Sequence, residues 1–79
     1  MKQNALMHVK LVKRGARLHE RFRYRDALPF FEEAFELSPN CPATIYNLAN
    51  TLHMLDREKE AQNLLSKLIH MSKADLAAG

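Results

Sequence analysis

The chain matches itself when it is shifted by 34 residues, and the matched positions agree in size and polarity. Small residues meet small residues, and large apolar residues meet large apolar residues. The matched pairs are Leu11 and Ile45, Gly15 and Ala49, Leu18 and Leu52, Ala27 and Ala61, Phe31 and Leu65, Phe35 and Ile69, His19 and His53, and Arg23 and Arg57. A repeat of this length is one small unit that stacks on its copy, because neither copy buries its apolar face alone.

Apolar residues recur at steps of three and four, which predicts α-helices, and the alternation typical of strands is absent. We expect a first helix that carries the stripe Leu11, Gly15, Leu18 and Phe22, and the stripe breaks around residues 22–26. Further helices are predicted from Tyr24 or Arg25 to Leu37, from about Ala43 to Leu55, and from Glu58 to at least Met71. Prolines end the second helix, and Asp56, which tolerates the left-handed conformation, makes the last turn. The predicted fold class is all-α, with two antiparallel hairpins stacked on each other.

The spacing also predicts which residues are buried. Small residues at Gly15, Ala27, Ala49 and Ala61 allow two helices to approach closely, and Phe31 and Leu65 are expected to fill the space beside them. The predicted buried positions are Ala27, Phe30, Phe31, Ala34, Phe35 and Leu37 in the second helix, Ile45, Leu48, Ala49 and Leu52 in the third, and Ala61, Leu64, Leu65, Leu68 and Ile69 in the fourth.

Length and composition limit the classes of function that this chain can have. Seventy-nine residues allow one small domain, 1–79, and no nucleophile–base set, phosphate-binding loop or paired carboxylate motif is present. We therefore expect a protein that is not an enzyme and holds no cofactor. One cysteine, Cys41, makes no internal disulfide. Neither a secretory signal nor a membrane-spanning segment is expected, which favours a cytoplasmic location.

The pattern resembles a pair of tetratricopeptide (TPR) repeats. Gly15 matches the small residue of the first helix of a repeat, and the second helix carries Tyr24, then Ala27, Phe31 and Ala34, then the terminating Pro39. The second unit departs from the family pattern at Glu58, Leu68 and Lys73. The resemblance places repeat one at about 8–41, repeat two at about 42–75 and a C-terminal extension at 76–79. It implies a superhelical, non-catalytic protein–protein interaction module or scaffold.

The resemblance further implies that the first helices of the two repeats line a concave groove for a peptide or helix of a partner. The predicted groove residues are Val9, Val12, Ala16, His19, Arg23, Tyr46, Asn47, Asn50, His53 and Arg57. Family members that clamp a C-terminal carboxylate use a lysine and an asparagine where this chain has Val12 and Ala16, and only Asn47 matches, so a mixed groove anchored by Tyr46 is the better hypothesis. The alternative is that these are ordinary half-exposed helix residues. His19 and His53 lack further ligands, so no metal is expected.

A basic face on the first helix leaves three interpretations open. Residues 1–25 carry eight Lys or Arg and one Glu, within a net charge of +3. Lysines and arginines spaced by three and four form the face: Lys10, Lys13, Arg14, Arg17 and Arg21. Arg14 stands where the second repeat has the apolar Leu48, which favours a solvating cap at the end of the stack. An acidic protein partner and, with less support, a nucleic acid are the alternatives.

The last helix carries a wider apolar arc than one neighbour covers. Its residues are Leu64, Leu65, Leu68, Ile69 and Met71. Such an arc predicts either a homodimer through this helix or a C-terminal extension that shields it in a monomer.

Overall fold

Four α-helices form the structure, a computed structural model that describes the backbone of residues 2–78 and the side chains of residues 5–71. The helices are α1 (Lys2–Glu20), α2 (Tyr24–Leu37), α3 (Pro42–Met54) and α4 (Glu58–Ala78). No strand occurs between residues 2 and 78, so the all-α fold class is confirmed. The third helix starts one residue earlier than expected because Pro42, whose ring presets the helical φ angle, occupies its first turn.

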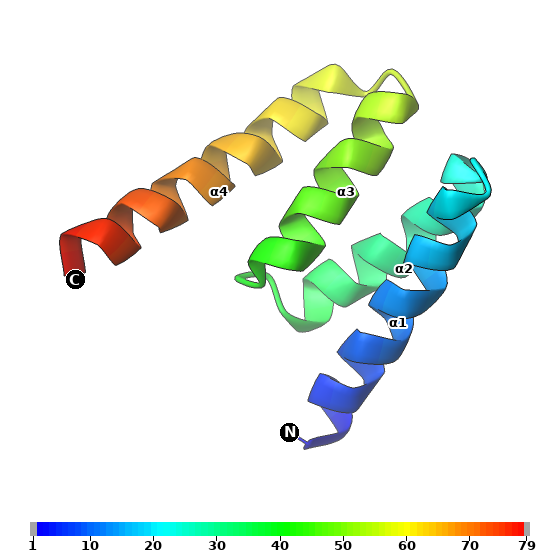
Figure 1. The fold of residues 1–79 in the computed structure, drawn as a ribbon, viewed down its shortest axis with the longest axis horizontal. Coiled ribbons are helices and arrows are strands. Elements are labelled where there is room, and N and C mark those ends of the chain that lie inside the picture. Colours follow the sequence, from blue (N-terminus) through cyan, green and yellow to red (C-terminus); the bar gives the residue numbers. More distant parts are fainter. Residues whose placement is uncertain (1, 79) are drawn as a thin grey trace.

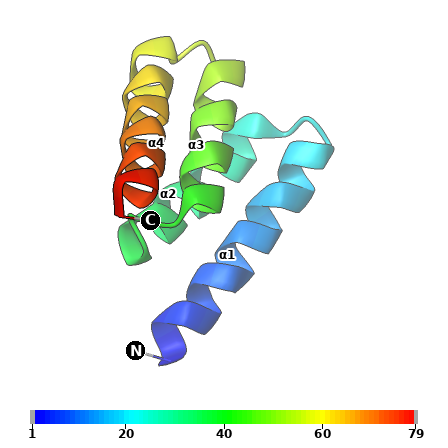
Figure 2. The same cartoon turned by 60° about the vertical axis from the view of Figure 1, so that its left-hand side comes forward.

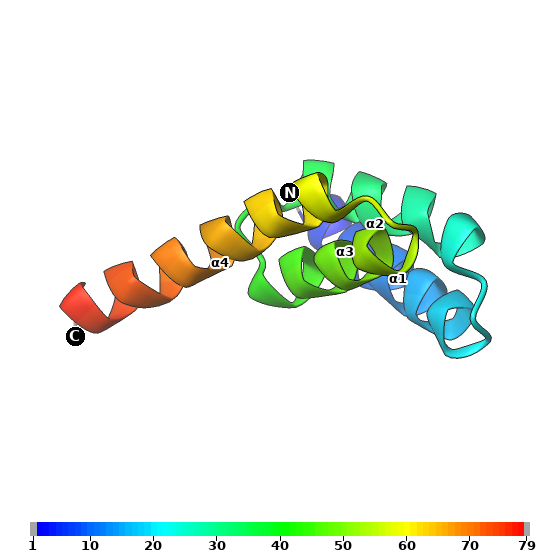
Figure 3. The same cartoon turned by 90° about the horizontal axis from the view of Figure 1, so that it is seen from above.

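The helices form two antiparallel hairpins, α1 with α2 and α3 with α4, joined by packing of α2 on α3 (Figure 1). Seen edge-on, α1 and α3 lie in one layer, and α2 with the first half of α4 lies in the other (Figure 3). The Cα atoms span only 17 Å across these layers. Since one helix with its side chains is about 10 Å thick, each helix keeps one side in solvent. Figure 2 shows α3 and α4 meeting at their shared turn.

Both hairpins turn in the same way, 34 residues apart. Phe22 and Asp56 have positive φ angles of 61° and 62°. In each turn the following arginine donates its backbone N–H five residues back, Arg23 to the carbonyl of Leu18 at 2.9 Å and Arg57 to that of Leu52 at 2.8 Å. This is the Schellman end of a helix, which needs one left-handed residue. The left-handed turn predicted at Asp56 is confirmed, and the one at Phe22 is its copy. The prediction that Phe22 continues the apolar stripe of the first helix is wrong, because the turn leaves its side chain 77% exposed.

The core lies where the small residues let α1 and α2 meet. Phe31 is only 1% exposed, and its ring lies directly against Gly15. A Cβ atom added to Gly15 would lie 2.7 Å from Cε1, 2.8 Å from Cζ and 3.0 Å from Cδ1 of Phe31. Ordinary carbon contacts are about 3.5–4.0 Å, so no side chain fits there without moving the ring. Ala27 and Ala61 are buried as predicted.

The predicted burial of α4 is partly wrong. Ala61 is buried and Leu64 packs against the core, but Leu65 is 39% exposed and Ile69 is 56% exposed. Within the described residues, the α4 backbone approaches α3 and neither of the other helices. Figure 1 shows the C-terminal half of α4 extending away from the other three helices. One neighbour covers only one stripe of a helix, so Leu65 does not play the space-filling role of Phe31.

Two further expectations differ in outcome. Phe30, predicted to be buried, is only partly so, because it lies at the outer edge of the α1/α2 hairpin. The fourth helix does continue beyond Met71, as far as Ala78. The prediction that residues 73–78 shield the apolar arc depends on side chains that lie outside the described residues.

Candidate binding surfaces

The predicted groove residues lie on α1 and α3 or in the turns that follow these helices. Val9 and Tyr46 are the exposed apolar members, at 45% and 56%. Val12 is half-buried and packs against the core, whereas Asn47 and Asn50 are half-buried on α3. Because α1 and α3 share one layer and contact each other, the two helices form one common side of the molecule. We call it the α1/α3 face.

The charged members of that face are paired within the chain. Arg23 binds Asp26 at 2.8 Å and Arg57 binds Glu60 at 2.7 Å, each pair at the same place in its repeat. The hydrogen bond to Glu60 raises the pKa of Arg57 above its ordinary value. His53 contacts Glu58. These carboxylates lower the net positive charge at the end of the α1/α3 face where the two hairpins turn.

The two predicted histidines occupy different surroundings. His19 is half-buried, its ring packs edge-on against Tyr24 with centroids 4.8 Å apart, and its Nε2 atom is buried without a hydrogen-bond partner among the described residues. His53 is exposed and contacts Glu58. No group of three or more His, Cys, Asp or Glu residues that could hold a metal ion occurs in the part of the chain that the structure describes.

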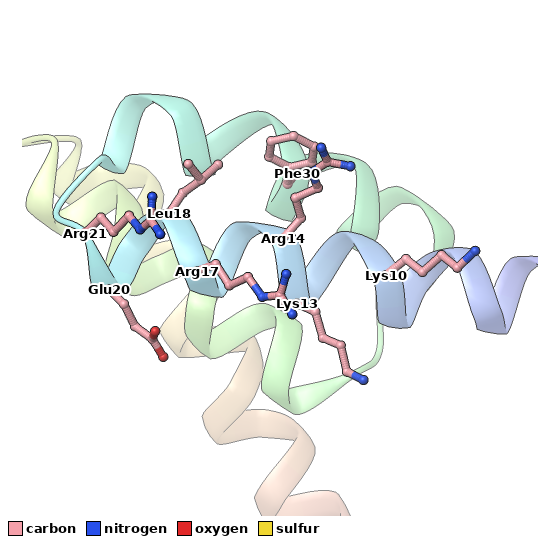
Figure 4. Close-up of a pocket in the computed structure, with 8 residues that line it drawn as sticks. All are labelled: Lys10, Lys13, Arg14, Arg17, Leu18, Glu20, Arg21 and Phe30. Carbon is pink, nitrogen blue, oxygen red and sulfur yellow. The ribbon is translucent and has the colours of Figure 1, made fainter.

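The basic face of α1 forms one wall of an open cavity of about 840 Å³ (Figure 4). Its lining consists of Lys10, Lys13, Arg14, Arg17, Leu18, Glu20, Arg21 and Phe30. The guanidinium of Arg14 lies over the Phe30 ring, 5.8 Å from its centroid. Glu20 points away from Phe30 (Figure 4). We call this feature the basic cavity; the basic residues were expected from the sequence, but the cavity between the helices was not.

A family model described as tetratricopeptide repeat matches residues 18–78. The chain belongs to the tetratricopeptide repeat family. Neither the curated proteins nor the solved structures that were compared include a match. The matched segment contains the end of α1 and all of the other three helices, so most of the first TPR helix, including four of the five predicted basic-face positions, lies before it. TPR domains generally bind protein partners and are typically non-catalytic scaffolds.

One cross-repeat contact of this TPR pair was missed by the sequence analysis. His8 on α1 and the buried hydroxyl of Thr44 on α3 are hydrogen-bonded through Nε2 and Oγ1 at 2.6 Å. His8 lies 36 residues from Thr44, so the 34-residue repeat gives no hint of the pair. The bond gives the buried Thr44 hydroxyl a partner from the other repeat and so links the two hairpins.

Thr44 also acts on Cys41, which precedes α3. Partial burial raises the pKa of the Cys41 thiol, but hydrogen bonds from the Thr44 hydroxyl and from the backbone N–H groups of Thr44 and Ala43 more than offset it. The pKa of Cys41 therefore lies below its ordinary value. The N-terminus of a helix stabilises a thiolate in this way.

No helix in the described part of this TPR chain combines the length and the apolar character that crossing a membrane requires.

Proposed function

We propose that this TPR pair is a non-catalytic interaction module of the cytoplasm that binds a peptide or helix of another protein along the α1/α3 face. The observation that carries the proposal is the exposure of Tyr46, 56% of whose surface is open on the layer shared by α1 and α3. A tyrosine presents a large apolar ring and a polar tip, and such residues commonly dominate binding energies at interfaces.

The surroundings of Tyr46 suit an extended or helical segment. Asn47 and Asn50 lie within about one turn of Tyr46 on α3, and their amides both donate and accept hydrogen bonds. Val9 supplies an exposed apolar contact on α1. Since Arg57 and His53 are paired with acids of the chain itself, the face offers backbone hydrogen bonding and an aromatic anchor more than a charge.

A display library of random peptides selected on the whole chain tests this proposal. The Tyr46→Ala, Asn50→Ala double variant is expected to weaken the selected peptide at least about tenfold, equivalent to 1.4 kcal/mol, because it removes the anchor and one amide. Gln62→Ala with Asn63→Ala, two exposed amides on α4, is the control and is expected to change affinity less than about threefold. If the double variant bound the selected peptide as tightly as the wild type does, the α1/α3 face would be excluded as the binding site.

A second proposal concerns the exposed side of α4. Leu65 and Ile69 stand one turn apart and together leave an apolar stripe in solvent. A two-fold contact between two copies of α4 would cover the same stripe on both chains and close the assembly.

Sedimentation velocity over a range of concentrations checks the dimer. The wild-type chain is expected to shift from monomer to dimer as concentration rises, and the Leu65→Glu, Ile69→Glu variant to remain monomeric, because four carboxylates would face each other in the dimer. Asn63→Glu with His70→Glu makes the same charge change at exposed positions on the other side of α4 and should leave dimerisation largely in place. A wild-type chain that stays monomeric at about millimolar concentration would contradict the proposal.

A further inference from the structure

We propose that the basic cavity is a second docking site, which takes an acidic segment of a protein partner carrying an apolar anchor side chain. This site uses other residues than the α1/α3 face, so it stands or falls independently of the function proposed above.

The charge of the cavity is strong and unneutralised. Five of its eight lining residues are lysine or arginine, and one, Glu20, is acidic. Among residues 5–71, none of these five bases takes part in an ion pair, whereas Arg23 and Arg57 elsewhere are both paired. Uncompensated like charges on one helix repel each other and are relieved by a ligand of opposite charge. The carboxylates that would pair with these five bases must therefore come from a ligand.

The cavity also has an apolar part, which a purely solvating face does not need. Leu18 and Phe30 face the same space from α1 and α2, and Phe30 is only partly buried (Figure 4). Arg14 lies over the Phe30 ring and so stands between the basic and apolar parts. An apolar side chain inserted here would cover Phe30 and exclude water from Arg14, which strengthens a charge-assisted hydrogen bond to a carboxylate.

The dimensions match a short segment of protein. Lys10 and Arg21 lie eleven residues apart on α1 and its following turn, which corresponds to about 16 Å along the helix axis. A helical ligand of about eleven residues, or about five residues in extended form, spans this length. Carboxylates at three- and four-residue spacing would meet the bases of α1 in register.

The same features favour a protein segment over a nucleic acid. Single strands are held by a continuous basic track together with aromatic faces on which bases stack. Here Arg14 lies over the Phe30 ring, and α2 exposes Glu32, Glu33 and Glu36 immediately after it. One of them, Glu33, lies one turn after Phe30 on the same side of α2, and its carboxylate repels a phosphate chain that crosses the hairpin there, whereas a peptide confined to α1 avoids it.

Fluorescence anisotropy with a labelled peptide tests the proposal on the whole chain. The probe is a peptide of about twelve residues, with glutamates at three- and four-residue spacing around a central Leu-Phe pair. One reference peptide has glutamine for every glutamate, and a second has serine for both apolar residues. We expect the probe to bind at least tenfold more tightly than either reference peptide. We also expect the affinity of the probe to fall as the salt concentration rises from about 0.05 to 0.2 M.

Charge reversals locate the site. Arg14→Glu with Arg17→Glu is expected to raise the Kd at least tenfold. Arg25→Glu with Lys59→Glu makes the same change in net charge at exposed positions outside the cavity and is expected to raise it less than threefold. Circular dichroism checks the fold of each variant. Should the reversal unfold the chain, the neutral pair Arg14→Gln and Arg17→Gln replaces it, with an expected rise of at least threefold.

Four results would overturn the proposal. In the first, the probe does not bind. In the second, the glutamine peptide binds as tightly as the probe. In the third, the Arg25 and Lys59 reversal weakens probe binding as much as the Arg14 and Arg17 reversal, which would indicate a non-specific charge effect. In the fourth, a single-stranded oligonucleotide binds more tightly than the probe and displaces it, and its affinity falls as much as that of the probe when Arg14 and Arg17 are reversed. That result would assign the cavity to nucleic acid.

Discussion

Replacing Phe31 with alanine is expected to remove most of the stability of this domain. Phe31 is 1% exposed and belongs to the core cluster that joins α2, α3 and α4. Deleting a buried phenyl ring costs about 3–5 kcal/mol, because the transfer energy is lost and the remaining cavity collapses only in part. A single core in a chain of fewer than about 80 residues rarely supplies more than about 3–5 kcal/mol, so such a loss leaves little.

Thermal unfolding followed by circular dichroism measures this effect. We expect the midpoint to fall by more than about 10 °C, since one kcal/mol corresponds to about 4–8 °C in a domain of this size. The control is Leu65→Ala, which removes the repeat equivalent of Phe31 but starts from a side chain 39% exposed. Measured at a dilution that favours the monomer, it should cost clearly less than Phe31→Ala. Equal losses would show that Leu65 is buried in the folded monomer.

Gly15→Leu is expected to destabilise the same contact from the other side. Its Cβ atom alone would lie 2.7 Å from a ring carbon of Phe31, and the rest of the side chain needs still more room. Overpacking of a core typically costs about 1–3 kcal/mol. Loss of a glycine from a helix interior returns somewhat less than about 1 kcal/mol, so we expect a net loss of up to about 2 kcal/mol.

A double-mutant cycle with Phe31→Ala separates overpacking from other causes. Alanine at position 31 removes the atoms that the side chain introduced by Gly15→Leu would strike, so the combined variant should lose less than the sum of the two single variants. Denaturant titration of the four chains supplies the free energies of unfolding. Strict additivity would mean that Gly15 and Phe31 do not constrain each other in the folded chain.

The helices and their turns were predictable because their causes are local. The stops after Leu37 and around Asp56 follow from backbone preferences of a few residues, which act before any tertiary contact forms. The left-handed residue at Phe22 was harder to expect. Phenylalanine disfavours that conformation, and only the matching turn at Asp56 indicates it.

The candidate binding surfaces were predictable only in part. The spacing on α1 assembles Lys10, Arg14 and Arg17 on one side of a helix, which the sequence shows directly. The cavity, however, requires Phe30 of α2 to stand opposite them, and a helical pattern assigns Phe30 to the buried side. Whether a residue at the edge of an apolar stripe is covered depends on which neighbour lies beside it.

The sequence alone is sufficient to predict four helices, two repeats and the close contact of small residues with Phe31, because size and periodicity act along one chain. Helix packing, by contrast, leaves Leu65 and Ile69 exposed, although they match Phe31 and Phe35 in the repeat. The first hairpin has α3 close beside its second helix, whereas within the described residues the α4 backbone lies close to α3 alone and reaches α2 only through side chains, such as Lys67 over the Phe35 ring. Burial depends on the number of neighbouring helices, and equal positions in a repeat become unequal where the stack has a neighbour on one side alone.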